Sequence, residues 1–254
     1  MLTDAARYVI IHNVRREKKL RPRQKGIMIM KIDKRKTYGI LFDSETANGL
    51  EDALCYDMCW QIIDTHGNKY ASRGYINRDV FVNMKDLMQS AYYADKIPYY
   101  WEMVKNGKRK ITTMANIIKA LRKDIKDYDI KFICAHNARF DYHAMNTTQR
   151  YLTKSKYRFV LPYGIEWYDT MKMAKKVVAN MPTYRRFCEE NGYMTKHKVP
   201  RVRLTAEVLY RFISKDNDFV EEHMGLEDVD IERRIFQYCR NTKRISLSDC
   251  KAWN

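Results

Sequence analysis

Three short patterns contain the side chains best suited to chemistry. Asp43 and Glu45 stand two residues apart, Asp141 lies near the middle of the chain, and His223 precedes Asp228 by five positions. Carboxylates and an imidazole can together hold two divalent cations and take a proton from water. Oxygen ligands favour Mg²⁺ or Mn²⁺, and two such ions can contact the attacking and leaving oxygens of a phosphodiester displacement. The patterns therefore predict metal-assisted hydrolysis of a phosphate ester.

The charge of the chain indicates the class of partner. It contains 48 Lys plus Arg against 31 Asp plus Glu, a formal net charge of +17 at pH 7. Acidic residues gathered within a cationic chain favour a polyanionic substrate, and nucleic acid is the natural candidate. The alternative is a generally basic protein without a dedicated groove.

Basic residues are concentrated at the beginning of the chain. From Arg15 to Lys36 there are eleven basic residues and two acidic ones. Such a run repels itself, so we predict a basic N-terminal extension at 1–36 and a catalytic domain at 37–254. Both a solvated arm and a direct contact with nucleic acid are compatible with this composition.

Cysteine usage and hydropathy point to a cytoplasmic protein without a membrane segment. The six cysteines form no Cys-x-x-Cys pair, which favours reduced thiols. Cys55 and Cys59 alone lack the second pair that a structural zinc site requires. The apolar stretch Tyr8 to Ile11 is too short for a signal peptide or a membrane span.

Hydrophobic periodicity predicts the elements that position the acidic residues. The apolar run 38–42 is typical of a buried strand, and 53–64 and 69–77 read as two further antiparallel strands around a turn. The stretch 105–110 reads as a solvated basic loop. Further strands are expected at 131–135 and 165–169, and helices at 84–93, 113–127, 140–152, 170–179, 183–191, 204–213 and 228–240. This order predicts an α/β fold in which helices flank a mixed sheet of three antiparallel strands followed by parallel strands.

Two carboxylates fall on helix faces that should point inward. Asp141 aligns with Ala144, Met145, Thr148 and Leu152, and Asp228 aligns with Ile231, Ile235 and Cys239. A buried ionised carboxylate is costly unless a cation or hydrogen-bond donors meet it. Asp228 alone could instead complement a helix N-terminus.

The remaining candidates lie on a strand and in a connection. Asp43 and Glu45 alternate with Ser44, so they point to the same face of a strand. His223 lies just before the Asp228 helix, and an imidazole with a pKa near 6.5 is suited to act as a base at neutral pH. His136 is a second candidate for substrate contact.

Three segments resemble the motifs of the DEDDh branch of the DnaQ-like 3′–5′ exonuclease family, which has the RNase H-like fold. They read Phe-Asp-Ser-Glu-Thr-Ala-Asn-Gly-Leu at 42–50, Ala-His-Asn-Ala-Arg-Phe-Asp at 135–141, and His-Met-Gly-Leu-Glu-Asp at 223–228. The resemblance covers about 38–240. Gly225 stands where the family commonly carries Ala, and the extension at 1–36 has no counterpart.

The resemblance implies roles for individual residues. Asp43, Glu45, Asp141 and Asp228 would bind two Mg²⁺ or Mn²⁺ ions, one through Asp43, Asp141 and Asp228 and the other through Asp43 and Glu45. His223 would be the general base. The neighbouring residues expected to contact the terminal nucleotide are Thr46, Asn137 and Phe140.

The resemblance also implies an activity. It predicts removal of nucleoside 5′-monophosphates from the 3′ ends of DNA or RNA, preferably single-stranded. Because the chain has no polymerase motif, a proofreading role would require a separate polymerase or other protein partner. Two alternatives remain open: an RNA-specific exoribonuclease, and a nucleic-acid- or partner-binding protein on the same fold without significant catalysis.

Overall fold

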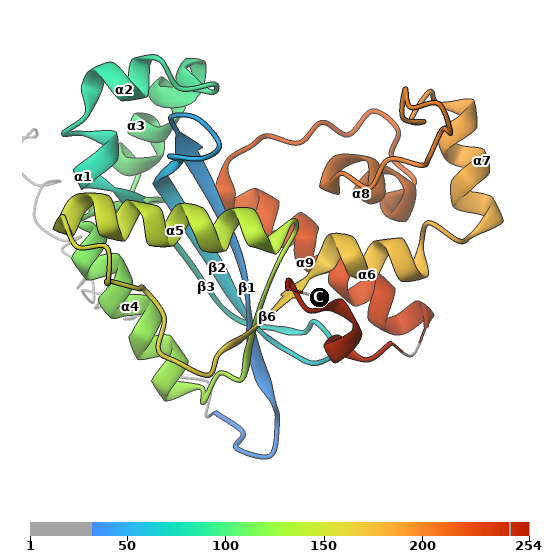
Figure 1. Cartoon of the computed structure of the whole chain (residues 1–254), viewed down its shortest axis with the longest axis horizontal. Helices are drawn as coiled ribbons and strands as arrows, with labels where there is room; N and C mark the ends of the chain where they lie inside the picture. Colours follow the sequence, from blue (N-terminus) through green and yellow to red (C-terminus); the bar gives the residue numbers. More distant parts are fainter. Residues whose placement is uncertain (1–31, 244, 254) are drawn as a thin grey trace, which may run out of the picture. The chain divides into compact units, whose positions relative to one another are not determined.

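The structure, a computed structural model, describes residues 32–243 and 245–253. In this part of the chain a mixed six-stranded sheet forms the centre of the protein (Figure 1). The compact unit begins at Ile32, so most of the extension predicted at 1–36 lies outside the described residues. The strand order is β4-β3-β2-β1-β5-β6. The strands are β1 (Tyr38–Ala47), β2 (Leu54–Asp64), β3 (Lys69–Asn77), β4 (Lys110–Thr112), β5 (Phe132–Ala135) and β6 (Glu166–Asp169).

The pairing of the strands confirms the predicted fold class. Strands β1, β2 and β3 are antiparallel neighbours, whereas β5 and β6 join on the other side of β1 as parallel strands. This is the mixed sheet of an RNase H-like fold. Strand β4, which the sequence analysis missed, adds to the far edge in parallel with β3.

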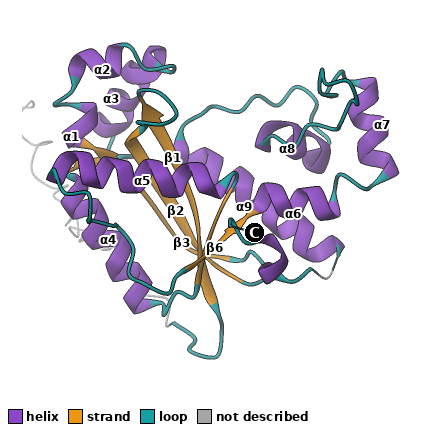
Figure 2. Ribbon diagram, viewed as in Figure 1, coloured by secondary structure: helices purple, strands orange, loops and turns teal. Residues whose placement is uncertain are grey.

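Helices cover both faces of the sheet. Ile40 and Phe42 of β1 pack against α4 (Met114–Asp127) and α5 (Ala138–Thr153), and Figure 1 shows α5 crossing the strands. Leu41, which points the other way, packs against helices on the second face. Figure 2 shows these helices grouped to one side; they are α6 (Thr170–Val177), α7 (Pro182–Glu190), α8 (Ala206–Ser214) and α9 (Gly225–Thr242).

A smaller helical layer follows β3. Helices α1 (Arg78–Phe81), α2 (Lys85–Gln89) and α3 (Ile97–Lys105), with the short 3₁₀ helix η1 (Ala94–Lys96), pack on a third apolar cluster that includes Tyr56 and Tyr100. A second 3₁₀ helix, η2 (Leu247–Cys250), lies near the end of the chain. The layer formed by α1, α2, α3 and η1 matters for function because η1 reaches the segment that contains His223, as described below.

Two local predictions in this region were wrong. The helix expected at 84–93 ends at Gln89, and residues 90–93 form turns before η1. The loop expected at 105–110 is not simply solvated, because Arg109 is 4% exposed and forms an ion pair with buried Asp57. That pair joins residues far apart in the sequence, so a local charge pattern could not reveal it.

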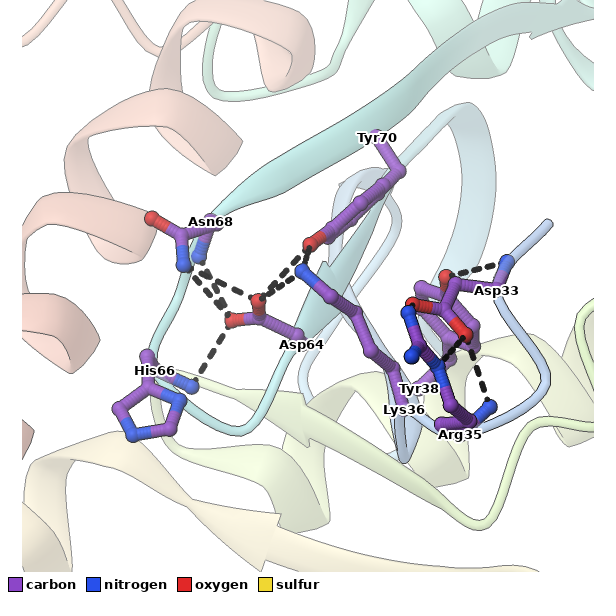
Figure 3. Close-up of polar contacts among 8 residues, drawn as sticks. All are labelled: Asp33, Arg35, Lys36, Tyr38, Asp64, His66, Asn68 and Tyr70. Atoms are coloured by element: carbon purple, nitrogen blue, oxygen red, sulfur yellow. Dashed lines mark hydrogen bonds and ion pairs between the residues drawn. The ribbon is translucent and has the colours of Figure 1, made fainter. Parts of the chain in front are cut away.

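The predicted turn between β2 and β3 is closed by one carboxylate. Asp64 accepts hydrogen bonds from the backbone N–H groups of His66 (2.9 Å) and Asn68 (3.1 Å) and from the Tyr70 hydroxyl (2.9 Å) (Figure 3). Although burial acts in the opposite direction, these bonds lower the pKa of Asp64. Lys36 approaches the same carboxylate at 3.6 Å, so the last residues of the predicted extension are tied to the sheet.

The cysteines behave as small apolar residues. All six are free thiols and all are buried, as their scattered spacing indicated. Within the described part of the chain, no helix is both long enough and apolar enough to span a bilayer.

Candidate active site

The end of β1 leaves an open edge on which the first two carboxylates lie. Pairing of β1 with β5 ends at Leu41 and Cys134, so from Asp43 onward β1 keeps β2 as its sheet partner. Alternation directs Asp43 and Glu45 toward the face covered by α9, and Ser44 toward α5. This arrangement lets two helices approach one strand end from opposite faces.

Asp141 reaches this edge from the first turn of α5. It is 3% exposed and accepts a hydrogen bond of 2.8 Å from the Ser44 hydroxyl. Burial raises the pKa of Asp141 to about 7, although the Ser44 bond acts in the opposite direction. The inward stripe predicted for this helix is observed, since Ala144, Met145 and Thr148 are also buried.

Asp228 reaches the edge from the first turn of α9. It is 4% exposed, and its Oδ1 atom has no hydrogen-bond partner among the described residues. Burial raises the pKa of Asp228 to about 6. Carboxylate oxygens of Asp228 and Glu45 and a ring nitrogen of His223 lie within 4.8 Å of one another, so this group could hold a cation.

Asp43 lies at the centre of the acidic group. Its Oδ2 atom is buried and lacks a partner in the described structure. Burial raises the pKa of Asp43 well above its usual value, and the negative charges of Glu232, Glu45 and Asp141 raise it further. The structure therefore brings all four predicted carboxylates into one electrostatically coupled cluster.

His223 is held in a specific orientation. Its backbone is left-handed (φ 49°), and its ring stacks on Tyr93 with centroids 4.6 Å apart and planes inclined by 19°. The Lys96 ammonium group of η1 lies over the Tyr93 ring, 4.7 Å from its centroid. It also donates a hydrogen bond to the carbonyl oxygen of Glu222, the residue before His223. Burial lowers the pKa of His223, which favours the neutral ring at pH 7.

Two features of the site were missed by the sequence analysis. Glu232 of α9 is 4% exposed, its Oε2 atom has no partner among residues of known placement, and burial raises its pKa well above normal. It lies one turn after Asp228, so the inward stripe of α9 could have identified it. The second feature is Asp57, which lies opposite Glu45 on β2 and is fully buried. It forms an ion pair with Arg109 and accepts a hydrogen bond of 3.0 Å from the Tyr100 hydroxyl.

The residues predicted to contact the substrate lie around this cluster. Thr46 follows the β-bulge at the end of β1 and is half-buried, and exposed Asn137 adopts a left-handed backbone (φ 70°) before α5. Phe140 packs partly against the core on the α5 face.

His136 has a structural position. Its Nδ1 atom is 2.9 Å from the Thr170 hydroxyl, and its Nε2 atom is 2.7 Å from the Leu204 carbonyl oxygen. Both ring nitrogens are therefore occupied by the protein. Asp169, next to Thr170, accepts hydrogen bonds from the N–H groups of Met171 and Lys172 and so caps α6.

The donor set fits divalent cations. Asp43, Asp228 and Glu232 each have a buried carboxylate oxygen with no partner in the described part of the chain, and such an oxygen carries the full cost of desolvation. The raised pKa values of Asp43 and Asp228 have a related cause: besides burial, the nearby negative charges oppose the ionisation of each carboxyl group. Hard oxygen ligands of this kind suit Mg²⁺ or Mn²⁺, which would remove the repulsion.

Gly225 permits the close approach of α9 to the strands. A Cβ atom at this position would lie 3.0 Å from Cys59 Sγ, 3.2 Å from Asp57 Oδ2 and 3.4 Å from Asp43 Oδ2. Glycine at this point therefore brings the start of α9 against the acidic cluster.

We expect Gly225→Ala to destabilise the protein by about 1 kcal/mol or more, although alanine usually stabilises a helix relative to glycine. The added methyl group must displace Cys59 or Asp57. Chemical denaturation would measure the change. Gly49→Ala is the control because nothing lies within 4 Å of its Cβ position. Equal stability of the two variants would contradict this account of Gly225.

No protein-family model and no curated protein matches the chain. Exonuclease X in complex with 5′ overhanging duplex DNA is similar in structure, with a TM-score of 0.44, 17% identity, and coverage of 83% of this chain and 96% of that one. E. coli Exonuclease I in complex with a dA16 oligonucleotide gives a TM-score of 0.47 and 12% identity over 82% of this chain.

The zinc-bound form of an E. coli ExoI–ssDNA complex gives a TM-score of 0.48 and 12% identity over 81% of this chain. The chain spans 41% of both Exonuclease I chains.

Proposed function

We propose that this protein is a metal-dependent 3′–5′ exonuclease that hydrolyses the terminal phosphodiester bonds of DNA or RNA and releases nucleoside 5′-monophosphates. The observation that carries the proposal is a group of carboxylates beside a half-buried histidine at the open end of β1, in which some buried oxygens have no partner among the described residues. The order of the three motifs resembles the DnaQ-like family and supports the 3′–5′ direction and the preference for single-stranded 3′ ends.

The acidic residues would hold the metal ions. Asp43, Asp141 and Asp228 would bind one Mg²⁺ or Mn²⁺ ion, and Asp43 and Glu45 would bind the second. When bound, such a pair activates the attacking water and stabilises the leaving 3′ oxygen. The Ser44 hydroxyl fixes the Asp141 carboxylate, and the Asp57–Arg109 ion pair supports the strand opposite Glu45.

His223 would accept the proton of the attacking water. A general base must be unprotonated and correctly placed. The lowered pKa of His223 provides the neutral ring, and stacking on Tyr93 limits its rotation. Because hard cations favour oxygen, Mg²⁺ binding does not need the imidazole, although the ring lies close to Glu45 and Asp228.

His223→Ala is expected to lower kcat by about 10²–10⁴-fold with a much smaller change in oligonucleotide binding, because it removes a base. Tyr93→Ala should lower kcat by about tenfold through loss of ring orientation, whereas Tyr93→Phe, which keeps the stack, should stay close to the parent enzyme. Steady-state kinetics at saturating Mg²⁺ would measure these effects. Equal losses for the two Tyr93 variants would contradict a role in stacking.

Digestion of matched DNA and RNA oligonucleotides tests the proposed function. Substrates labelled at either the 5′ or the 3′ end would be incubated with Mg²⁺ or with a chelator, and the products would be sized. Stepwise shortening from the 3′ end with release of mononucleotides is the expected result, and the preferred sugar separates DNA from RNA degradation. Binding without cleavage in Mg²⁺ and Mn²⁺ would instead favour a non-catalytic binding protein.

A further inference from the structure

A hollow lined by basic residues lies between α6, α7 and the segment 199–204. Its volume is about 720 Å³. Figure 1 shows α6 leading away from the end of β6 toward α7. Of the residues that the structure describes, five basic side chains and one acidic side chain, Asp249, line the hollow; the basic residues are Lys172, Lys175, Lys176, Arg185 and Arg201.

Most of this positive charge is not neutralised by the protein. Lys175, Lys176 and Arg201 are exposed, and none of them pairs with an acid within residues 32–243 and 245–253. Arg185 pairs with Glu189 at 3.0 Å. The Lys172 ammonium group instead donates to the carbonyl oxygens of Lys251 (2.7 Å) and Ala252 (3.0 Å). Three cations therefore remain available to an anionic ligand.

The hollow is connected to the candidate active site by short contacts. Leu204 forms part of its wall, and the carbonyl oxygen of Leu204 contacts the ring of His136, at the end of the strand that precedes Asp141. Lys172 lies in the first turn of α6. Asp169, which caps that helix, accepts a hydrogen bond of 3.2 Å from the backbone N–H group of Asn137. One wall of the hollow is thus fixed to the segment that carries the second acidic motif.

We propose that this basic hollow binds the phosphate backbone of the nucleic-acid strand whose 3′ end occupies the candidate active site. The inference rests on the proposed function and adds a binding surface to it. Among residues 32–243 and 245–253, no aromatic side chain lines the hollow. It therefore offers charge without base stacking, and it should bind strands independently of sequence.

The test is the triple variant Lys175→Gln, Lys176→Gln, Arg201→Gln, which keeps Lys172 and Arg185 in their internal contacts. Binding of a fluorescent single-stranded oligonucleotide would be titrated at several salt concentrations in the presence of a chelator. We expect affinity to fall by about ten- to a hundredfold at low salt, and the salt slope to decrease by about 2. The matched control is Lys110→Gln, Lys119→Gln, Lys126→Gln, which removes the same charge from exposed positions on β4 and α4, none of which lines the hollow.

Several outcomes are decisive. Equal binding by both triple variants, or an unchanged salt slope, would overturn the proposal. Loss of inorganic phosphate binding to the same degree as loss of oligonucleotide binding would also overturn it, since the hollow would then be a site for a free anion.

The binding titration needs no catalysis, so it separates the two proposals. If the parent protein cleaves no substrate but the triple variant still loses affinity, the exonuclease proposal fails and the binding surface stands. If the parent protein cleaves oligonucleotides and the variant binds normally, only the binding surface fails.

Discussion

Asp228→Asn should abolish hydrolysis, with kcat lowered by at least about 10³-fold, whereas Asp230→Asn, two residues further along α9, should leave kcat unchanged. Both substitutions remove one negative charge from the same helix. Asp228 faces the acidic cluster and has an oxygen without a partner in residues 32–243 and 245–253, while Asp230 pairs with Lys69, Arg233 and Arg234. Kinetics with end-labelled oligonucleotides at saturating Mg²⁺ would measure the difference.

The same two variants should differ in their effect on stability. Burial raises the pKa of Asp228 to about 6, whereas the pKa of Asp230 is lowered to about 2 despite burial, chiefly by Arg233 and Arg234. In metal-free protein, Asp228→Asn removes repulsion and should not lower the melting temperature. Asp230→Asn removes surface ion pairs and should cost up to about 1 kcal/mol. Calorimetry with a chelator checks both.

Asp141→Ala should show the same loss of turnover with the fold intact. Asp141 is held by Ser44 within the cluster, so the substitution removes a proposed metal ligand without opening the central core. Circular dichroism would verify the fold. Substantial activity in both Asp141→Ala and Asp228→Asn would remove the basis of the metal proposal.

Removal of divalent cations should abolish activity. It should also make the stability of the folded protein fall as the pH rises. Asp141 and Asp228 have ordinary pKa values of 3.8, which burial raises to about 7 and about 6 in the folded protein. Between about pH 4 and pH 7, the metal-free native state therefore binds more protons than the unfolded state. Stability must fall as the pH rises through this window.

We expect the melting temperature of the metal-free protein to decrease by roughly 5–10 °C between pH 5 and pH 8. Mg²⁺ should restore most of the loss at pH 8 and little at pH 5, because bound cations favour ionised carboxylates. Scanning calorimetry with Mg²⁺ or a chelator would measure this. Asp141→Asn is the internal control and should flatten the pH dependence. An equal effect of Mg²⁺ at both pH values would contradict the proposed ligands.

Local periodicity was sufficient to predict much of the fold and the four carboxylates. Alternation along β1 places Asp43 and Glu45 on one face, and the inward stripes of α5 and α9 contain Asp141 and Asp228. An acidic residue on an apolar stripe can be recognised without knowing its neighbours, because the cost of burying a charge implies a partner. The sequence therefore determined which faces of β1, α5 and α9 these acidic residues occupy, and it determined the class of sheet.

Only the tertiary structure decided what surrounds these residues. The stacking of Tyr93 on His223 joins segments about 130 positions apart, and the Asp57–Arg109 pair joins a strand to a segment that reads locally as a solvated loop. The basic hollow likewise combines α6, α7 and a later segment. Periodicity fixes the face on which a side chain lies, whereas the partner it meets depends on how separate elements pack, and that information is spread over the whole chain.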